Sequence, residues 1–260
     1  MKKFVIVGTQ RTGSSALAEA LGMHPGVACG WEWSTRVPWH HKLKAPERAL
    51  EGDFSLLCAS ERAHMERIFS PSLDWIGYRS LFRSSDKWLF APRFNVGLFA
   101  DRLEGHLKWF ARQRDLHILH IIRRDNIEWL KSKYAAHATH AYVGKEYPDG
   151  LKIYVPIRTS IRRLLAKNWV DTRLSRLSQT NPYLAITYEV FLNDRNRVLA
   201  GARGFLGLNP VALDQAVAKI VRQSTGDASR YISNHESLRL ALEKHQLLTS
   251  SSAEMKVTEL

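Results

Sequence analysis

Short apolar runs alternate with helical patterns along much of the chain. Three of these runs predict buried strands, and they lie at residues 3–8, 116–125 and 183–189. Apolar positions at helical spacing follow each run, over residues 14–25, 126–138 and 194–208. Because strands that alternate with helices are typical of parallel sheets, we expect an α/β fold with a central parallel sheet and helices on both faces.

The remaining segments read mainly as helices. Residues 54–113 are predicted to be mostly helical, and they hold much of the aromatic content. A basic amphipathic helix is expected at 157–177, and two late helices at 211–223 and 235–248. A chain of 260 residues can form one sizeable core, so we expect a single domain over 1–248 and a loose polar tail over 249–260.

The segment between the first strand and the first helix reads GTQRTGSS, residues 8–15. Phosphate loops of kinases and ATPases follow G-x-x-x-x-G-K-[ST], and Gly8 and Gly13 have this spacing. Ser14 replaces the lysine, and Arg11 supplies a cation inside the loop. Such a loop can turn backbone N–H groups toward an anion at a helix N-terminus, although an ordinary glycine-rich turn is the alternative.

The second strand does not end as ATP chemistry requires. Triphosphate transfer uses Mg²⁺ held in part by an acid that ends a hydrophobic strand. Here Arg123 and Arg124 come first, and Asp125 only after them. Arginine at the carboxyl end of a strand indicates an anion ligand. A sulfuryl group carries less negative charge than a γ-phosphoryl group and can be transferred by protein cations alone, so no metal is expected.

Three segments together resemble sulfotransferases that use 3′-phosphoadenosine-5′-phosphosulfate (PAPS). They are QRTGSS at 10–15, RRDNIEWLKS at 123–132, and ITYEVFLNDRNRVLAGARGFLGL at 186–208. The resemblance implies a P-loop NTPase-like sulfotransferase fold, and it is closer to the bacterial carbohydrate and lipid type than to the cytosolic phenol type. The expected enzyme moves a sulfuryl group from PAPS to an acceptor hydroxyl and releases adenosine 3′,5′-bisphosphate.

The same resemblance assigns the donor-binding residues. The 5′-phosphosulfate would be bound by Arg11, Thr12, Gly13, Ser14 and Ser15, and the 3′-phosphate by Arg124 and Ser132. Arg11 would also stabilise charge on the leaving bridging oxygen. Arg222 matches a closing segment of the family loosely, and Ser224 with it; a solvated basic helix end is the alternative there.

Two positions depart from the family pattern. Ala16 stands where cytosolic members have a Trp near the adenine, and Phe90 stands where many members have a Lys near the sulfate. Arg93 or Lys87 would substitute for that lysine, or Arg11 would carry the charge alone.

Glu32 is the candidate general base. It follows the first helix between Trp31 and Trp33, at the place where the carbohydrate-type members keep a glutamate. A structural loop glutamate is the alternative, with His40 and His41 as reserve bases. No histidine follows the APRF segment, where cytosolic members have their base.

Composition leaves two rivals and an open acceptor. The formal charge of +13 favours anionic partners, which admits a nucleic-acid-binding protein beside an atypical P-loop small-molecule kinase. The second strand does not end in the acid that a kinase would need. Aromatic residues interleaved with basic residues on a sheet, which are typical of nucleic-acid binders, are not visible either, so no nucleic acid partner is expected. The acceptor is expected to be a saccharide, glycolipid or related small molecule. Tyr188 and Glu189 are expected to be structural.

Location and surface chemistry follow from smaller signals. Two cysteines, Cys29 and Cys58, and the lack of a signal peptide or spanning segment predict a cytoplasmic protein. The basic helix at 157–177 is either a solvated face or a peripheral contact to an acidic or membrane-linked acceptor. The arginines in question are Arg162, Arg163, Arg173 and Arg176. Pairs of histidines are present without a cysteine or acid cluster, so a zinc site is not expected.

Overall fold

The computed structural model describes residues 1–30, 44–70, 72–82, 96–140, 147–209 and 227–248. Contacts divide the chain into two compact units. The first is Met1–Ile122 with Ala166–Ile220, and the second is Arg123–Leu165 with Val221–Leu260. The single domain over 1–248 stays a prediction.

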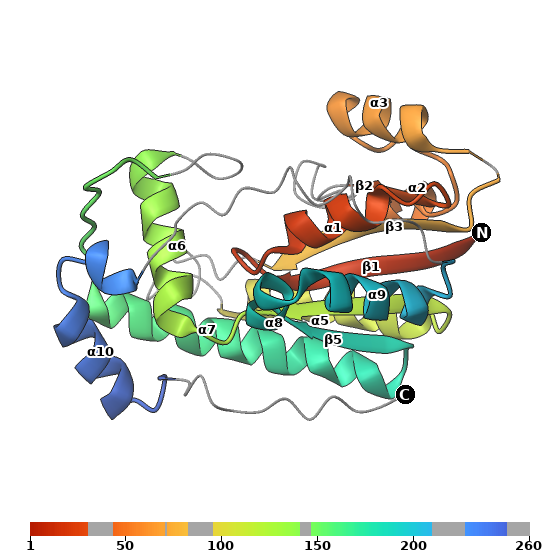
Figure 1. Cartoon of the computed structure of the whole chain (residues 1–260). Helices are drawn as coiled ribbons and strands as arrows, with labels where there is room; N and C mark the ends of the chain where they lie inside the picture. The colour runs from red at the N-terminus through yellow and green to blue at the C-terminus, as the bar shows by residue number, and fades with distance from the viewer. Residues whose placement is uncertain (31–43, 71, 83–95, 141–146, 210–226, 249–260) are drawn as a thin grey trace. The chain divides into compact units, whose positions relative to one another are not determined.

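The first unit is built on a five-stranded sheet. The strands are β1 (Lys2–Thr9), β2 (Val27–Gly30), β3 (Trp75–Phe82), β4 (Leu116–Ile122) and β5 (Tyr183–Thr187). Their order is β2-β3-β1-β4-β5, and every neighbouring pair is parallel (Figure 1). The predicted parallel α/β fold is therefore confirmed. β1 lies in the middle of the sheet, with β2 and β3 on one side and β4 and β5 on the other. The carboxyl end of β1 is therefore a topological switch point, where open α/β sheets bind ligands.

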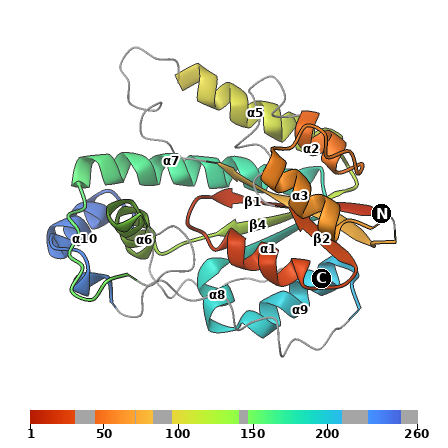
Figure 2. The same ribbon diagram turned by 90° about the horizontal axis from the view of Figure 1, so that it is seen from above.

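Helices cover both faces of this sheet (Figure 2). Phe4 and Ile6 of β1 share a core with residues of α1 (Ser14–Gly22) and α9 (Arg195–Leu206). Val5 and Val7 share the opposite core with residues of α5 (Val96–Arg112) and the later part of α7 (Ile157–Ser175). Because β1 is buried on both sides, its sequence is a continuous apolar run rather than an alternating one.

The helical prediction for residues 54–113 is wrong at its centre. Helix α3 (Ala59–Ile68) and α5 lie in this range, but β3 stands between them, and it pairs with β1 along its whole length. Trp75, Ile76 and Tyr78 are all buried, so β3 shows no alternation of apolar and polar positions. The four-residue β2 was also missed, and a short helix, α2 (Lys44–Ala49), follows it in the chain.

The second unit is helical. It holds α6 (Asn126–Thr139), the first half of α7, the short helix η4 (Ala228–Arg230) and α10 (His235–Lys244). Trp129 and Leu130 of α6 pack in one core with Leu164, Leu238 and Leu242. These helices confirm the predictions for 126–138, 157–177 and 235–248, whereas the predictions for 211–223 and 249–260 lie outside the described residues.

Candidate functional site

Two glycines set the path of the loop after β1. A Cβ on Gly8 would lie 2.6 Å from the carbonyl oxygen of Ile121 on the neighbouring strand. Gly13 has φ 83°, and a Cβ there would lie 2.5 Å from ring atoms of Tyr188. Tyr188 begins α8 (Tyr188–Asn193), so its ring packs against the loop. Steric contact therefore requires glycine at both positions of the predicted spacing, and Gly13 needs it for its left-handed backbone as well.

The residues between these glycines differ in what their side chains do. The Thr12 hydroxyl is buried and donates to the Thr9 carbonyl oxygen at 2.8 Å, so it ties the loop to the end of β1. Arg11 is half-buried and has φ 67°, a left-handed conformation that is uncommon outside glycine. Backbone strain of this kind gathers at ligand sites, and Arg11 is the cation that the sequence placed there.

The start of α1 has the features of an anion site. Ser14 and Ser15 are its first two residues, and the preceding Gly13 offers no capping side chain. The backbone bond from the Leu17 amide to the Gly13 carbonyl, at 3.1 Å, opens the helical ladder. The amides of residues 14–16 therefore precede the ladder, and the helix dipole adds positive potential there. The first turn holds no acidic residue that would compete with a bound anion.

Sequence reasoning missed one cation at this helix start. Arg79 of β3 is half-buried, and its Nη1 donates to the Ser15 Oγ. The two residues are 64 positions apart, so no local motif connects them. The structure thus places a second arginine against the loop helix, in a part of the chain where the sequence predicted helix.

The two arginines that follow β4 differ in their surroundings. Arg123 is 6% exposed, and its Nη2 lies 3.5 Å from Oε2 of Glu128. The buried ammonium of Lys131 lies 2.7 Å from Oε1 of the same carboxylate. Arg124 is exposed, unlike its neighbour. Arg123 is therefore part of an internal ion-pair cluster, and the assignment of a ligand to Arg124 stays a prediction.

Asp125 and Ser132 have defined places on α6. The Asp125 carboxylate caps the helix by accepting the Glu128 amide proton at 2.8 Å. That role accounts for the acid nearest the strand end without a metal ion. Ser132 is half-buried in the middle of the helix, and its backbone carbonyl accepts a hydrogen bond from the Tyr147 hydroxyl at 3.2 Å.

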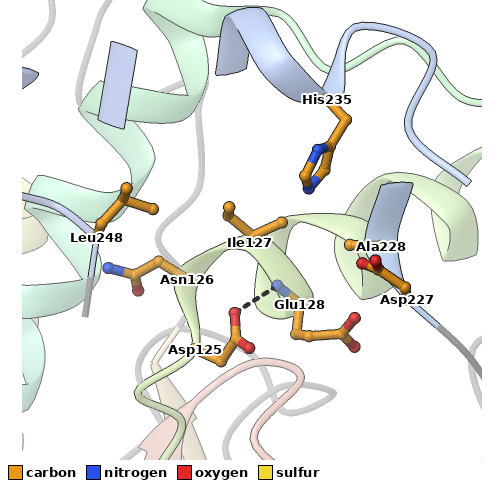
Figure 3. Close-up of a pocket in the computed structure, with 8 residues that line it drawn as sticks. All are labelled: Asp125, Asn126, Ile127, Glu128, Asp227, Ala228, His235 and Leu248. Atoms are coloured by element: carbon orange, nitrogen blue, oxygen red, sulfur yellow. Dashed lines mark hydrogen bonds between the residues drawn. The ribbon is translucent and has the colours of Figure 1, made fainter. Parts of the chain in front are cut away.

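A cavity of about 240 Å³ opens in the second unit beside the start of α6 (Figure 3). Its ionisable lining groups are Asp125, Glu128, Asp227 and His235. The Asp227 carboxylate accepts the Ser229 amide proton at 3.1 Å, and that hydrogen bond holds the pKa of Asp227 below its usual value. Three of these four groups are carboxylates, so the lining does not favour an anion.

The basic helix α7 uses its arginines in different ways. Arg162 is exposed, and so is Arg176, which lies just beyond α7 in the short helix η2 (Arg176–Gln179). The Arg163 guanidinium carbon lies 4.8 Å from the centre of the Tyr134 ring, and Arg173 forms an ion pair with Glu104 at 3.4 Å. The set is thus not a uniform basic face, and its recognition of an acceptor stays a prediction.

Several predicted residues lie outside the described part of the chain. They are Glu32, His40, His41, Lys87, Phe90, Arg93, Arg222 and Ser224. Within the described residues, no group of three His, Cys, Asp or Glu side chains is placed to hold a metal ion. No helix of that same part is both long and apolar enough to cross a bilayer.

Comparison with known proteins gives matches only among solved structures. No protein-family model matches the chain. No curated protein matches it either. A sulfotransferase from Alicyclobacillus acidocaldarius has 20% identity and a TM-score of 0.47, over 97% of this chain and 98% of that one.

Two further structures are similar to a comparable extent. The sulfotransferase domain of the Synechococcus PCC 7002 olefin synthase has 14% identity and a TM-score of 0.46, over 97% of this chain and 90% of that one. A mouse sulfotransferase complexed with PAP has 13% identity and a TM-score of 0.45, over 89% and 70%. These three structures are a bacterial sulfotransferase, a bacterial sulfotransferase domain and a mouse sulfotransferase.

Proposed function

We propose that the chain is a sulfotransferase that moves a sulfuryl group from PAPS to the hydroxyl of a saccharide, a glycolipid or a related small molecule. The proposal rests on the start of α1, which has two serines and no side-chain cap. The loop before it contains Arg11 and lacks the lysine of a P-loop. Such a site suits a phosphate-bearing donor whose transferred group needs no metal.

In this proposal the loop binds the 5′ end of the donor. The amides at the start of α1 and the hydroxyls of Ser14 and Ser15 donate hydrogen bonds to the phosphosulfate. Arg11 stabilises negative charge on the bridging oxygen, which keeps the electron pair as its bond to sulfur breaks. The acceptor oxygen forms the new bond to sulfur from the opposite side and loses its proton to a base.

The 3′-phosphate is assigned to Arg124 and Ser132. Arg124 is exposed while its neighbour Arg123 is ion-paired, and an arginine fork suits a phosphate group. This phosphate distinguishes PAPS from ordinary adenylates, so these two residues would set donor specificity.

Glu32 is the proposed base. Glu32 lies outside the described residues, and its assignment rests on its place after the first helix, between two tryptophans in the sequence. Glu32→Gln keeps the size of the side chain but cannot take the proton, so turnover should fall by roughly 10²–10⁴-fold while PAPS affinity stays within about threefold. Turnover close to that of the unaltered enzyme would remove Glu32 from the mechanism, with His40 and His41 as the next variants.

The proposal is tested by following labelled sulfate from PAPS into a panel of saccharide, glycolipid and phenol acceptors. We expect transfer to at least one acceptor class and full activity in excess EDTA. The atypical kinase predicts instead that ATP is consumed only with Mg²⁺. The nucleic-acid-binding alternative predicts salt-dependent binding of random RNA that an Arg11 substitution does not change. Either result, without sulfuryl transfer, would overturn the proposal.

A further inference from the structure

Arg79 joins β3 to the start of α1 through a single hydrogen bond. It stands opposite Ile6 in the register of β1 and β3, and its Nη1 donates to the Ser15 Oγ. Its Nε is buried without a hydrogen-bond partner. Within the described residues, its guanidinium forms no ion pair with a carboxylate.

Among the described residues, the charge of the half-buried Arg79 is therefore not paired with a carboxylate. Charged groups that are taken out of water are normally paired, because desolvation costs far more than it does for neutral groups. Arg79 differs in this from Arg123, which is paired with Glu128, and from Lys167, whose ammonium lies 3.3 Å from the Asp171 carboxylate. An anion at the start of α1 would supply the missing negative charge.

The hydrogen bond also fixes what Ser15 can do. A hydroxyl has one proton to donate and two lone pairs that accept. Because the guanidinium has no lone pair and only donates, it occupies an acceptor position of the Ser15 oxygen. The Ser15 proton is therefore left for another acceptor, and the side chain stands at the second residue of α1, where the helix amides favour an anion.

We propose that Arg79 is a positioning residue that holds Ser15 as a hydrogen-bond donor to a phosphate at the start of α1 and balances part of that phosphate's charge. The identity of the ligand as the 5′ end of PAPS rests on the proposed function, whereas the role of Arg79 toward a phosphate rests on the geometry of Arg79 and Ser15.

The test compares Arg79→Met, Arg79→Lys and Arg114→Met by calorimetric titration. Arg114 is an exposed arginine just before β4, at the opposite end of the strands from the loop. The Arg114→Met variant removes the same charge as Arg79→Met. We expect Arg79→Met to weaken adenosine 3′,5′-bisphosphate at least tenfold. Arg79→Lys should recover part of that loss, and Arg114→Met should change the affinity less than twofold. Adenosine 3′-monophosphate, which has no 5′-phosphate, should bind all variants alike.

A double-mutant cycle with Ser15→Ala separates positioning from a direct contact. If Arg79 acts through Ser15, the double variant should bind the bisphosphate about as weakly as the worse single variant. Fully additive losses, or equal losses for adenosine 3′-monophosphate, would overturn the inference. Melting temperatures of all variants are measured alongside, and a loss of affinity that follows the melting temperature and is not recovered by lysine would overturn it as well.

Inorganic pyrophosphate serves as a second probe, so that this inference and the proposed function can fail separately. Binding of pyrophosphate that Arg79→Met weakens, with no binding of the bisphosphate by the unaltered protein, would support the role of Arg79 and defeat the proposed donor. If the unaltered protein binds neither probe, the role of Arg79 falls.

Discussion

Helices α1 and α6 both follow a buried parallel strand, but the first turn of α6 carries an acid and that of α1 does not. α1 begins with two serines, has no side-chain cap and has no acid in its first turn. α6 begins with the Asp125 cap and carries Glu128, whose single carboxylate pairs with both Arg123 and Lys131. The start of α1 therefore has no side-chain cap, whereas the start of α6 is capped by Asp125.

This difference separates two ways of binding a phosphate. At α1 the donors are the loop backbone and two hydroxyls, with Arg11 and Arg79 as cations. At α6 the Asp125 side chain is the cap and Glu128 pairs with Arg123 and Lys131, and the exposed Arg124 is the cation proposed to bind the phosphate. Substitutions in the two regions should consequently have different effects. At α1 they should disturb the backbone conformation of the loop, and at α6 they should remove single contacts or lower the stability of the helix.

The largest effect is expected for Gly13→Ala. The new methyl group would force a left-handed backbone on alanine and meet the Tyr188 ring, which should cost about 2 to 5 kcal/mol of unfolding free energy. Binding of adenosine 3′,5′-bisphosphate should be lost with it. Chemical denaturation measures the first effect and titration the second. Gly204→Ala is the control, since nothing lies within 4 Å of its new methyl group in α9. An equally small effect in both variants would contradict the loop geometry.

Arg123→Ala should reduce stability rather than donor affinity. The variant removes a buried charge from the cluster around Glu128, and hydrogen bonds to charged groups contribute about 1.5–3 kcal/mol each. Denaturation should show a loss in this range, while the bisphosphate affinity of the folded protein changes less than about threefold. A donor-affinity loss as large as that of an Arg124 variant would mean that the two arginines share the phosphate.

The elements that could be predicted are those with a local signal. β1, α1, β4, α6, β5 and α9 were predicted because each apolar run or helical spacing is complete within its own segment. β3 was missed because Gly77, Arg79 and Ser80 interrupt its apolar run, and Arg79 was missed with it. The family resemblance selected Arg124 for the 3′-phosphate, but the ion pair of Arg123 could not be predicted, since it depends on where the Glu128 side chain lies.

Asp125→Ala should have a smaller effect that is confined to α6. It removes the carboxylate that accepts the Glu128 amide proton, and such caps contribute about 0.5–2 kcal/mol. Thermal denaturation should show the loss, and Asp125→Asn, which keeps a capping oxygen, should recover most of it. If Asp125 instead held a catalytic metal ion, Asp125→Asn would abolish activity without lowering the melting temperature.

The smallest effect concerns the thiols. Burial raises the pKa of Cys29 to about 12 and outweighs the Arg79 charge, which acts in the opposite direction. At pH 8 Cys29 is therefore almost wholly protonated, and iodoacetamide should leave it unmodified in the folded protein. Cys58 is less buried and should react first. Mass spectrometry of the alkylated protein distinguishes the two sites, and rapid labelling of Cys29 would contradict its burial at the end of β2.

The most direct test of the account is the titration of Arg124→Ala with two ligands. Adenosine 3′,5′-bisphosphate carries the 3′-phosphate that Arg124 is proposed to bind, and AMP does not. A charge-assisted contact of about 1.5–3 kcal/mol predicts at least tenfold weaker binding of the bisphosphate and an almost unchanged affinity for AMP. Equal losses for both ligands, or none for the bisphosphate, would contradict the assignment of the 3′-phosphate to the start of α6.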